Sequence, residues 1–248
     1  MSSKQPLIVL SGVSVRIFER SLATTLKQRL LRRDISGPAP QVTILEGIDL
    51  RVTPGDRLGI LGLNGSGKTS LLKAIAGIYP IAEGRRTVVG ELAPVIAQAI
   101  GFDAELTLRD NVRLGLIYAN RYGTWSPELE ARILDFAELS ARADQPLKLL
   151  SGGFQSRLAF SLSLFETPDI LLLDEILATG DFTFFEKARS AMLERMRETP
   201  ITLFVSHDEA QIRQICNRCI VLSRGRLIAD GTPNEVLPEY HRLAMEGQ

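Results

Sequence analysis

Short apolar runs alternate with stretches of helical spacing along most of this chain, and the alternation predicts an α/β fold. Short apolar runs of the kind expected for strands buried on both faces of a parallel sheet occupy residues 57–61, 170–173 and 201–205. Apolar positions at helical spacing lie in residues 70–76, 155–165 and 184–197. Strands and helices in this order predict a mainly parallel sheet covered by helices.

Strand patterns of a second kind lie toward the ends of the chain. Those that we expect to pair as an antiparallel edge sheet occupy residues 7–10, 13–18, 42–45 and 48–52. Near the C-terminus, residues 220–229 predict a hairpin that turns at 223–226, and a short helix follows near 234–240.

An insert at residues 19–41 separates the two halves of this edge sheet. Its first part places Leu22, Leu26 and Leu30 four residues apart, and basic side chains lie beside them. This pattern predicts a short basic amphipathic helix. Two interpretations stay open: a solvated surface helix that packs its leucines on its own domain, or a docking surface for a membrane subunit or an anionic lipid headgroup.

Residues 107–145 are charged and helical in pattern, and we expect a helical subdomain there. Ser126 followed by Pro127 is a typical helix start. The chain is then one domain, residues 1–248, whose α/β core spans about 1–106 and 146–248.

A glycine-rich stretch between a predicted strand and a predicted helix fits the pattern G-x-x-x-x-G-K-[ST] at every fixed position. Such glycines let the backbone curl so that its N–H groups point at a phosphate, and the start of the next helix adds to the field. We expect the lysine to reach the β- and γ-phosphates and the threonine hydroxyl to bind Mg²⁺. The residues of this predicted nucleotide site are Gly62, Leu63, Asn64, Gly65, Ser66, Gly67, Lys68, Thr69 and Ser70.

Two acidic residues, Asp174 and Glu175, follow the apolar run at 170–173. The carboxyl ends of parallel strands are where such a sheet binds its ligands. We expect Asp174 to hold Mg²⁺ and Glu175 to polarise the water that attacks the γ-phosphate.

The composition limits the kinds of partner and the cellular location that we expect. The 29 basic and 29 acidic side chains cancel, so that nothing in the overall charge favours nucleic acid. No apolar run approaches the ~18 residues of a membrane span, and the N-terminus lacks the build of a signal peptide. We therefore expect a cytosolic protein.

The two cysteines, Cys216 and Cys219, form a C-x-x-C without a second pair. A four-ligand zinc site has too few further ligands, because the only histidines are His207 and His241. We expect ordinary buried thiols.

The stretch Leu150-Ser151-Gly152-Gly153 resembles the signature of ATP-binding cassette (ABC) ATPases, and it lies at about the family's distance before Asp174. His207 resembles the family's switch histidine, Gln98 matches the spacing of its glutamine loop, and Asp181 falls where its aspartate loop ends. The likeness covers essentially the whole chain in the correct order.

This resemblance implies the cassette fold and a homodimer that closes on two molecules of ATP with Mg²⁺. Each nucleotide would lie between Lys68 of one copy and Ser151, Gly152 and Gly153 of the other. His207 would contact the γ-phosphate, and Gln98 would bind Mg²⁺ and pass its state to a partner.

Some less specific features resemble those of the cassettes that export O-antigen, capsular polysaccharide or teichoic acid. They are the insert 19–41, the stretches 77–80, 101–111 and 157–160, and residues 174–181 in place of the importers' usual pattern. This group implies a cargo of lipid-linked polysaccharide, a separate integral membrane channel, no nucleic acid, and a place on the cytoplasmic face of the bacterial inner membrane.

Three departures and two alternatives accompany this resemblance. Phe154 replaces the usual signature glutamine, Ile17 occupies the position expected for the adenine-stacking aromatic with Phe18 one place off, and many relatives carry a further carbohydrate-binding domain beyond this length. The alternatives are an importer or efflux cassette, or a soluble ABC ATPase of translation or repair.

Overall fold

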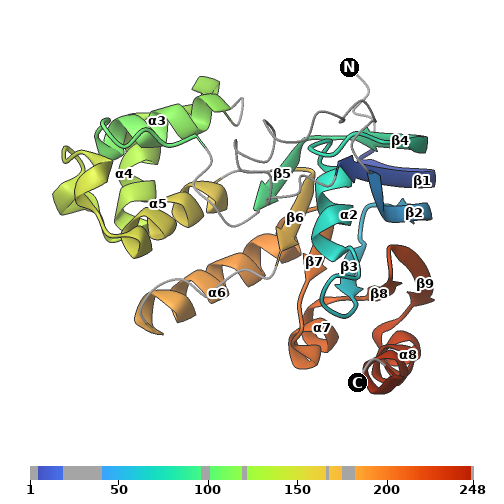
Figure 1. Cartoon of the computed structure of the whole chain (residues 1–248). Coiled ribbons are helices and arrows are strands. Elements are labelled where there is room, and N and C mark those ends of the chain that lie inside the picture. The colour runs from blue at the N-terminus through green and yellow to red at the C-terminus, as the bar shows by residue number, and fades with distance from the viewer. Residues whose placement is uncertain are drawn as a thin grey trace, which may run out of the picture.

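The computed structural model describes residues 5–18, 41–95, 101–118, 122–165, 168–174 and 182–246. The predicted basic helix of the insert, Gln98, Glu175 and Asp181 lie outside these residues. Figure 1 shows two β-sheets on one side of the molecule and a group of helices, α3, α4 and α5, on the other.

The larger sheet has six strands in the order β5-β6-β7-β3-β8-β9, parallel except for the last pair. Its strands are β5 (Leu92–Val95), β6 (Ile170–Asp174), β7 (Ile201–Val205), β3 (Arg57–Leu61), β8 (Arg218–Ser223) and β9 (Arg226–Gly231). The three central apolar runs and the C-terminal hairpin were predicted at these places. All five residues of β7 are buried, as a strand covered on both faces requires.

The smaller sheet is antiparallel and has the order β2-β1-β4. Its strands are β1 (Leu7–Phe18), β2 (Gln41–Val52) and β4 (Glu83–Val89). The first two are the predicted edge sheet. The sequence did not reveal β4 and β5, because each is an edge strand: β4 is mostly exposed, and β5 contains Pro94, which edge strands tolerate.

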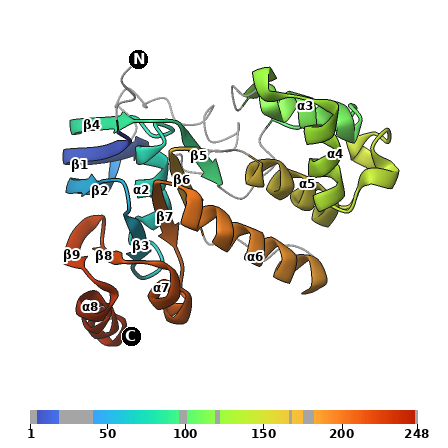
Figure 2. The same ribbon diagram turned by 180° about the vertical axis from the view of Figure 1, so that it is seen from behind.

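Helix α2 (Lys68–Ile75) lies between the two sheets (Figures 1 and 2). Its buried Leu71, Leu72 and Ile75 join one apolar cluster with side chains from both sheets, such as Leu10 and Leu203. Burial of this shared surface ties the start of α2 to both sheets at once.

The opposite face of the larger sheet is covered by helices that form a second apolar cluster. These helices are α6 (Phe182–Glu198), α7 (Glu209–Ile215) and α8 (Pro233–Glu246), together with the C-terminal half of α5 (Gly152–Leu164). Helix α8 continues beyond the predicted 234–240. Cys216 and Cys219 are buried in this cluster as free thiols, so the prediction of ordinary core residues is confirmed.

The helical region has its own apolar cluster, formed by α3 (Leu108–Tyr118), α4 (Pro127–Phe136) and α5. Short 3₁₀ turns connect them at Tyr122–Thr124, Ser140–Arg142 and Leu147–Leu149. The start of α4 was predicted, and the Ser126 hydroxyl accepts a bond from the Leu129 N–H at 3.1 Å. The cluster extends past residue 145, because Leu158 and Leu162 of α5 belong to it.

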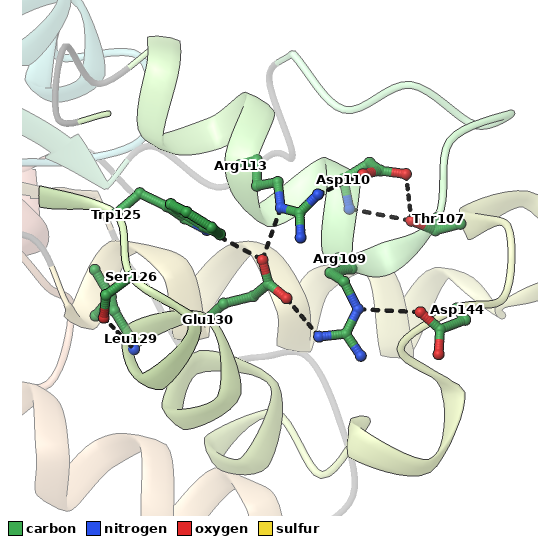
Figure 3. Close-up of polar contacts among 9 residues, drawn as sticks. All are labelled: Thr107, Arg109, Asp110, Arg113, Trp125, Ser126, Leu129, Glu130 and Asp144. Atoms are coloured by element: carbon green, nitrogen blue, oxygen red, sulfur yellow. Dashed lines mark hydrogen bonds and ion pairs between the residues drawn. The ribbon is translucent and has the colours of Figure 1, made fainter. Parts of the chain in front are cut away.

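Glu130 of α4 is a buried carboxylate inside this helical region, only 1% exposed (Figure 3). It accepts hydrogen bonds from the Arg109 guanidinium, from Arg113 Nε at 2.8 Å and from Trp125 Nε1 at 3.1 Å. Both arginines lie on α3, so that one carboxylate joins α3, α4 and the segment before α4. Burial alone raises the pKa of Glu130, but the bonds from Arg109, Trp125 and Arg113 outweigh it, and the pKa is lowered.

No helix among the described residues combines the length and the apolar character needed to cross a membrane.

We expect Glu130→Gln to lower the free energy of unfolding by about 2 kcal/mol at neutral pH, because the charged acceptor of three donors is lost. Since the pKa of Glu130 is lower in the folded than in the unfolded chain, its stabilisation is present above about pH 4.3 and is lost as the pH falls below that value. Urea unfolding at pH 7 and pH 3 measures both effects.

The matched control is Asp135→Asn, an exposed position on the same helix that should change stability by less than about 0.5 kcal/mol. A gap between wild type and Glu130→Gln that stays constant down to pH 3 would contradict the role of the carboxylate.

Candidate functional site

The loop that joins β3 to α2 holds the predicted glycine-rich motif, and its shape depends on close backbone packing. A Cβ atom on Gly62, which has a φ of 152°, would lie 2.4 Å from Ser66 Oγ and 2.5 Å from the Leu222 carbonyl oxygen of β8. The side chain of Ser66 is itself buried, and its Oγ has no hydrogen-bond partner. The loop therefore leaves no space for a side chain where it passes β8.

Lys68 is 9% exposed and is held within this loop. Its ammonium donates to the carbonyl oxygens of Gly62 at 2.7 Å and Leu63 at 3.1 Å. A charged group at this depth is stabilised by these carbonyl dipoles, and a stronger anionic acceptor can replace them.

The first turn of α2 presents polar backbone and hydroxyl groups next to this lysine. Gly67 is the N-cap in a left-handed conformation, with a φ of 108°, and it has no side chain that could accept a bond from the helix start. The turn carries no acidic residue, and Thr69 is exposed there. The unsatisfied N–H groups and the helix dipole make this an anion-binding position.

The carboxyl ends of two neighbouring strands form the far wall of the same site. Asp174 ends β6, and Val205 ends β7, after which come Ser206 and His207. Ser206 is buried and its Oγ accepts a bond from Asp208 N at 3.1 Å, while Asp208 caps α7. The turn that carries His207 is thus fixed by its neighbours.

These groups line one cavity of about 670 Å³, a volume within the range of small-molecule sites. Its lining residues are Val42, Thr43, Ile44, Asn64, Gly65, Gly67, Lys68, Thr69, Ser70, Asp174, Val205, His207, Arg224 and Gly225.

The structure thus brings together eight of the residues predicted to form the site: Asn64, Gly65, Gly67, Lys68, Thr69, Ser70, Asp174 and His207. Gly62, Leu63 and Ser66 belong to the same loop. Gln98 and Glu175 lie outside the described residues, and their predicted roles stay predictions.

Ser151, Gly152 and Gly153 do not line this cavity. They are exposed at the start of α5, in the helical region, and the Ser151 hydroxyl makes no bond that caps the helix. The helix begins at Gly152 rather than at the predicted 155. The signature stretch is therefore a second polar surface, on a different part of the same chain.

The cavity has a wall that the sequence did not indicate, formed by residues 42–44 of β2 and by the turn between β8 and β9. The Gly225 N–H donates to the Ser66 carbonyl at 2.9 Å, and the Glu46 N–H donates to the Gly225 carbonyl at 2.9 Å. The turn was predicted, but its packing on the glycine-rich loop is long-range and leaves no local signal.

Two oxygen-bearing side chains that line this cavity fit a hard divalent cation. A carboxylate on Asp174 and a hydroxyl on Thr69 line the same cavity, and magnesium prefers oxygen ligands of this kind together with phosphate oxygens and water. The lysine, the helix start and the acidic wall together suit a phosphorylated ligand with a bound metal ion.

Comparison with known proteins gives the family and the relatives. The family model described as ABC transporter matches residues 45–178. The chain is 37% identical over 227 residues to the teichoic acids export ATP-binding protein TagH of Enterococcus faecalis, covering 90% of this chain and 50% of that protein. It is 33% identical over 250 residues to the O-antigen export system ATP-binding protein RfbB of Myxococcus xanthus, covering 97% of this chain and 56% of that protein. The chain thus spans about half the length of these curated relatives.

Solved structures give the fold. An ATP-binding subunit of an ABC transporter superposes with a TM-score of 0.69 at 21% identity, over 95% of this chain and 98% of that one. A dimeric ATP-binding cassette in a post-hydrolysis state, bound to ADP and Pi, superposes with a TM-score of 0.68 at 22% identity. The predicted fold class is confirmed.

Gly62 and Gly65 offer a matched pair of substitutions in the loop. We expect Gly62→Ala to lower the free energy of unfolding by about 3 kcal/mol, because its Cβ would overlap Ser66 and β8. Gly65 has a φ of 78° but nothing within 4 Å of its Cβ position, so that Gly65→Ala should cost only about 1 kcal/mol of backbone strain.

Urea unfolding of the two variants beside wild type measures this difference. Equal losses of stability would mean that Gly62 is required for its backbone conformation alone and not for its close approach to β8.

Proposed function

The chain belongs to the ABC transporter family, and we propose that it is the ATP-hydrolysing subunit of an exporter that drives a polysaccharide or lipid-linked glycan across the cytoplasmic membrane through a separate membrane subunit. The observation that carries this proposal is the single cavity shared by Lys68, Thr69, Asp174 and His207. It would act on the cytoplasmic face of the membrane, on glycan cargo and not on nucleic acid.

ATP binding begins at the start of α2. The β-phosphate lies against the N–H groups of the loop and of the first helical turn, and Lys68 exchanges the carbonyls of Gly62 and Leu63 for phosphate oxygens. The exchange replaces neutral acceptors by an anion, which strengthens each hydrogen bond. The carbonyls of Gly62 and Leu63 thus hold the lysine at the place where the triphosphate needs it.

Magnesium would be held by the Thr69 hydroxyl and Asp174, with Gln98 as a further ligand. When bound, the ion neutralises charge on the β- and γ-phosphates. Its protein ligands stand on different elements, α2 and β6, whose relative position is fixed by the apolar cluster that they share.

Hydrolysis requires a water activated beside the γ-phosphate. Glu175 follows Asp174 directly in the chain, and we assign it the polarisation of that water. His207 follows β7, the strand next to β6. It contacts the γ-phosphate and holds the attacking geometry. Lys68 stabilises the charge that develops on the transferred group.

A second copy of the chain completes the site. Ser151, Gly152 and Gly153 lie at the start of α5, away from the cavity of their own chain, and offer a hydroxyl and free N–H groups. In a homodimer they bind the γ-phosphate of the nucleotide held by the partner. ATP then favours the closed state and hydrolysis releases it, a shift of population by differential binding.

The choice of cargo rests on the relatives. Proteins named for export of teichoic acids and of O-antigen are 33–37% identical over most of this chain. An importer or efflux cassette is the alternative, and a soluble cassette of translation or repair is a more distant one; none of the names among these relatives favours either.

We expect Glu175→Gln to bind ATP but to hydrolyse it at least ~100-fold more slowly, because the positioned base is lost while the phosphate contacts remain. Lys68→Ala should instead lose ATP affinity. A coupled phosphate-release assay and equilibrium binding of ATP separate the two effects. Glu186→Gln, at an exposed position on α6, is the control and should hydrolyse ATP like wild type.

The cargo is tested by purifying tagged Glu175→Gln chain from its native membranes in detergent with ATP and Mg²⁺. We expect an integral membrane protein and a lipid-linked glycan to co-purify, and Lys68→Ala chain to retain neither in an ATP-dependent manner. Recovery of ribosomes or DNA would contradict export, whereas recovery of a solute-import channel would favour the importer.

A further inference from the structure

Arg224, which lines the cavity, has no role in the scheme above. It occupies the turn between β8 and β9 with a φ of 47°, and it is one of only two non-glycine residues with a positive φ in the described part of the chain. A left-handed conformation costs about 1 kcal/mol for a residue with a Cβ. The hydrogen bonds of Gly225 to Ser66 and Glu46 hold the turn against the glycine-rich loop and β2, so that the backbone of Arg224 stays beside the cavity.

The sheet order sets the end of the cavity at which Arg224 lies. β8 flanks β3 on one side, whereas β7 and then β6, which ends in Asp174, flank it on the other. Neighbouring strands are about 4.8 Å apart, so three steps separate the ends of β6 and β8 by roughly 14 Å. Because the metal and the γ-phosphate belong at Asp174 and His207, Arg224 lies toward the nucleoside end of the ligand.

The wall at this end is apolar and partly open. Val42 of β2 is 43% exposed, and Ile17 of β1, its partner in the strand register, is 37% exposed. β9 contacts β2, which brings the turn beside this wall. This aliphatic surface suits one face of a planar base.

The charge of Arg224 is not compensated within the described residues. No ion pair or hydrogen bond joins it to them, and it is exposed. Arg226, two residues later, forms a bidentate ion pair with Glu46 and does not line the cavity. Of these two neighbouring arginines, Arg226 is paired with Glu46, whereas Arg224 lines the cavity.

We propose that the Arg224 guanidinium binds the nucleotide by stacking on the adenine base, which it holds against the aliphatic wall formed with Val42. This inference rests on the proposed function, because it takes ATP as the ligand. A guanidinium is planar and weakly hydrated, and it stacks on π systems in a way that an ammonium group does not. Arg224 is thus a specificity-determining residue for the base, while Lys68 and α2 recognise the phosphates.

The test measures the affinity of ATP and of inorganic tripolyphosphate, each with Mg²⁺, for chains that carry Glu175→Gln to prevent turnover. Arg224→Ala should weaken ATP binding roughly 5-fold and leave tripolyphosphate binding unchanged, because only ATP carries a base. Arg224→Lys should lose most of the same affinity. Arg226→Ala, the matched control on the same turn, should bind both ligands like the parent chain.

Arg224→Gly separates binding from folding. Glycine adopts a φ of 47° without strain, so this variant should keep or raise the thermal midpoint of unfolding while it loses ATP affinity. A purely structural arginine would lose both together.

Three results would overturn the inference: unchanged ATP affinity in Arg224→Ala, full affinity in Arg224→Lys, or an equal loss for tripolyphosphate, which would move the contact to the phosphates. Failure of the parent chain to bind ATP would instead contradict the proposed function itself.

Discussion

The structure depends on a close approach of backbone to backbone at the point where the two sheets meet. The loop after β3 passes β8 at Gly62, and the turn after β8 passes β2 at Gly225, where a Cβ would lie 2.6 Å from the Ile44 carbonyl. Two hydrogen bonds of Gly225 then join the loop, the turn and β2. The larger sheet supplies the loop and the smaller sheet supplies β2, so that neither sheet alone forms the cavity.

The helical region is joined to this core through α5. Its apolar cluster is separate from the one that surrounds α2, and α5 joins it to the core through Leu158 and Leu162 on one side and Phe160 and Leu164 on the other. A helix shared between two clusters ties the helical region to the larger sheet. Ser151, at its start, is thus positioned by the packing of both clusters.

The sequence predicted those parts of the fold and of the site that have a local cause. Lys68 and Thr69 belong to a motif that specifies its own loop, and Asp174 follows a buried strand whose apolar pattern was plain. The edge strands β4 and β5 were missed because β4 is mostly exposed, β5 contains Pro94, and neither has a periodic pattern. Arg224 was missed because its proximity to the cavity arises from the pairing of β3 with β8, which no local pattern encodes.

The residue after the signature glycines shows how a departure from a family pattern can be accommodated. The side chain of Phe154 cannot donate or accept a hydrogen bond, but the Cζ atoms of Arg142 and Arg157 lie over its ring, 5.2 Å and 5.1 Å from the ring centroid. Arg157 is buried and paired with Glu138, whereas Arg142 is exposed. The start of α5 thus carries a cation beside the positive end of a helix dipole. In the proposed dimer, a copy of this chain would meet its partner's triphosphate through backbone N–H groups and positive charge, for which a side-chain amide at position 154 is not required.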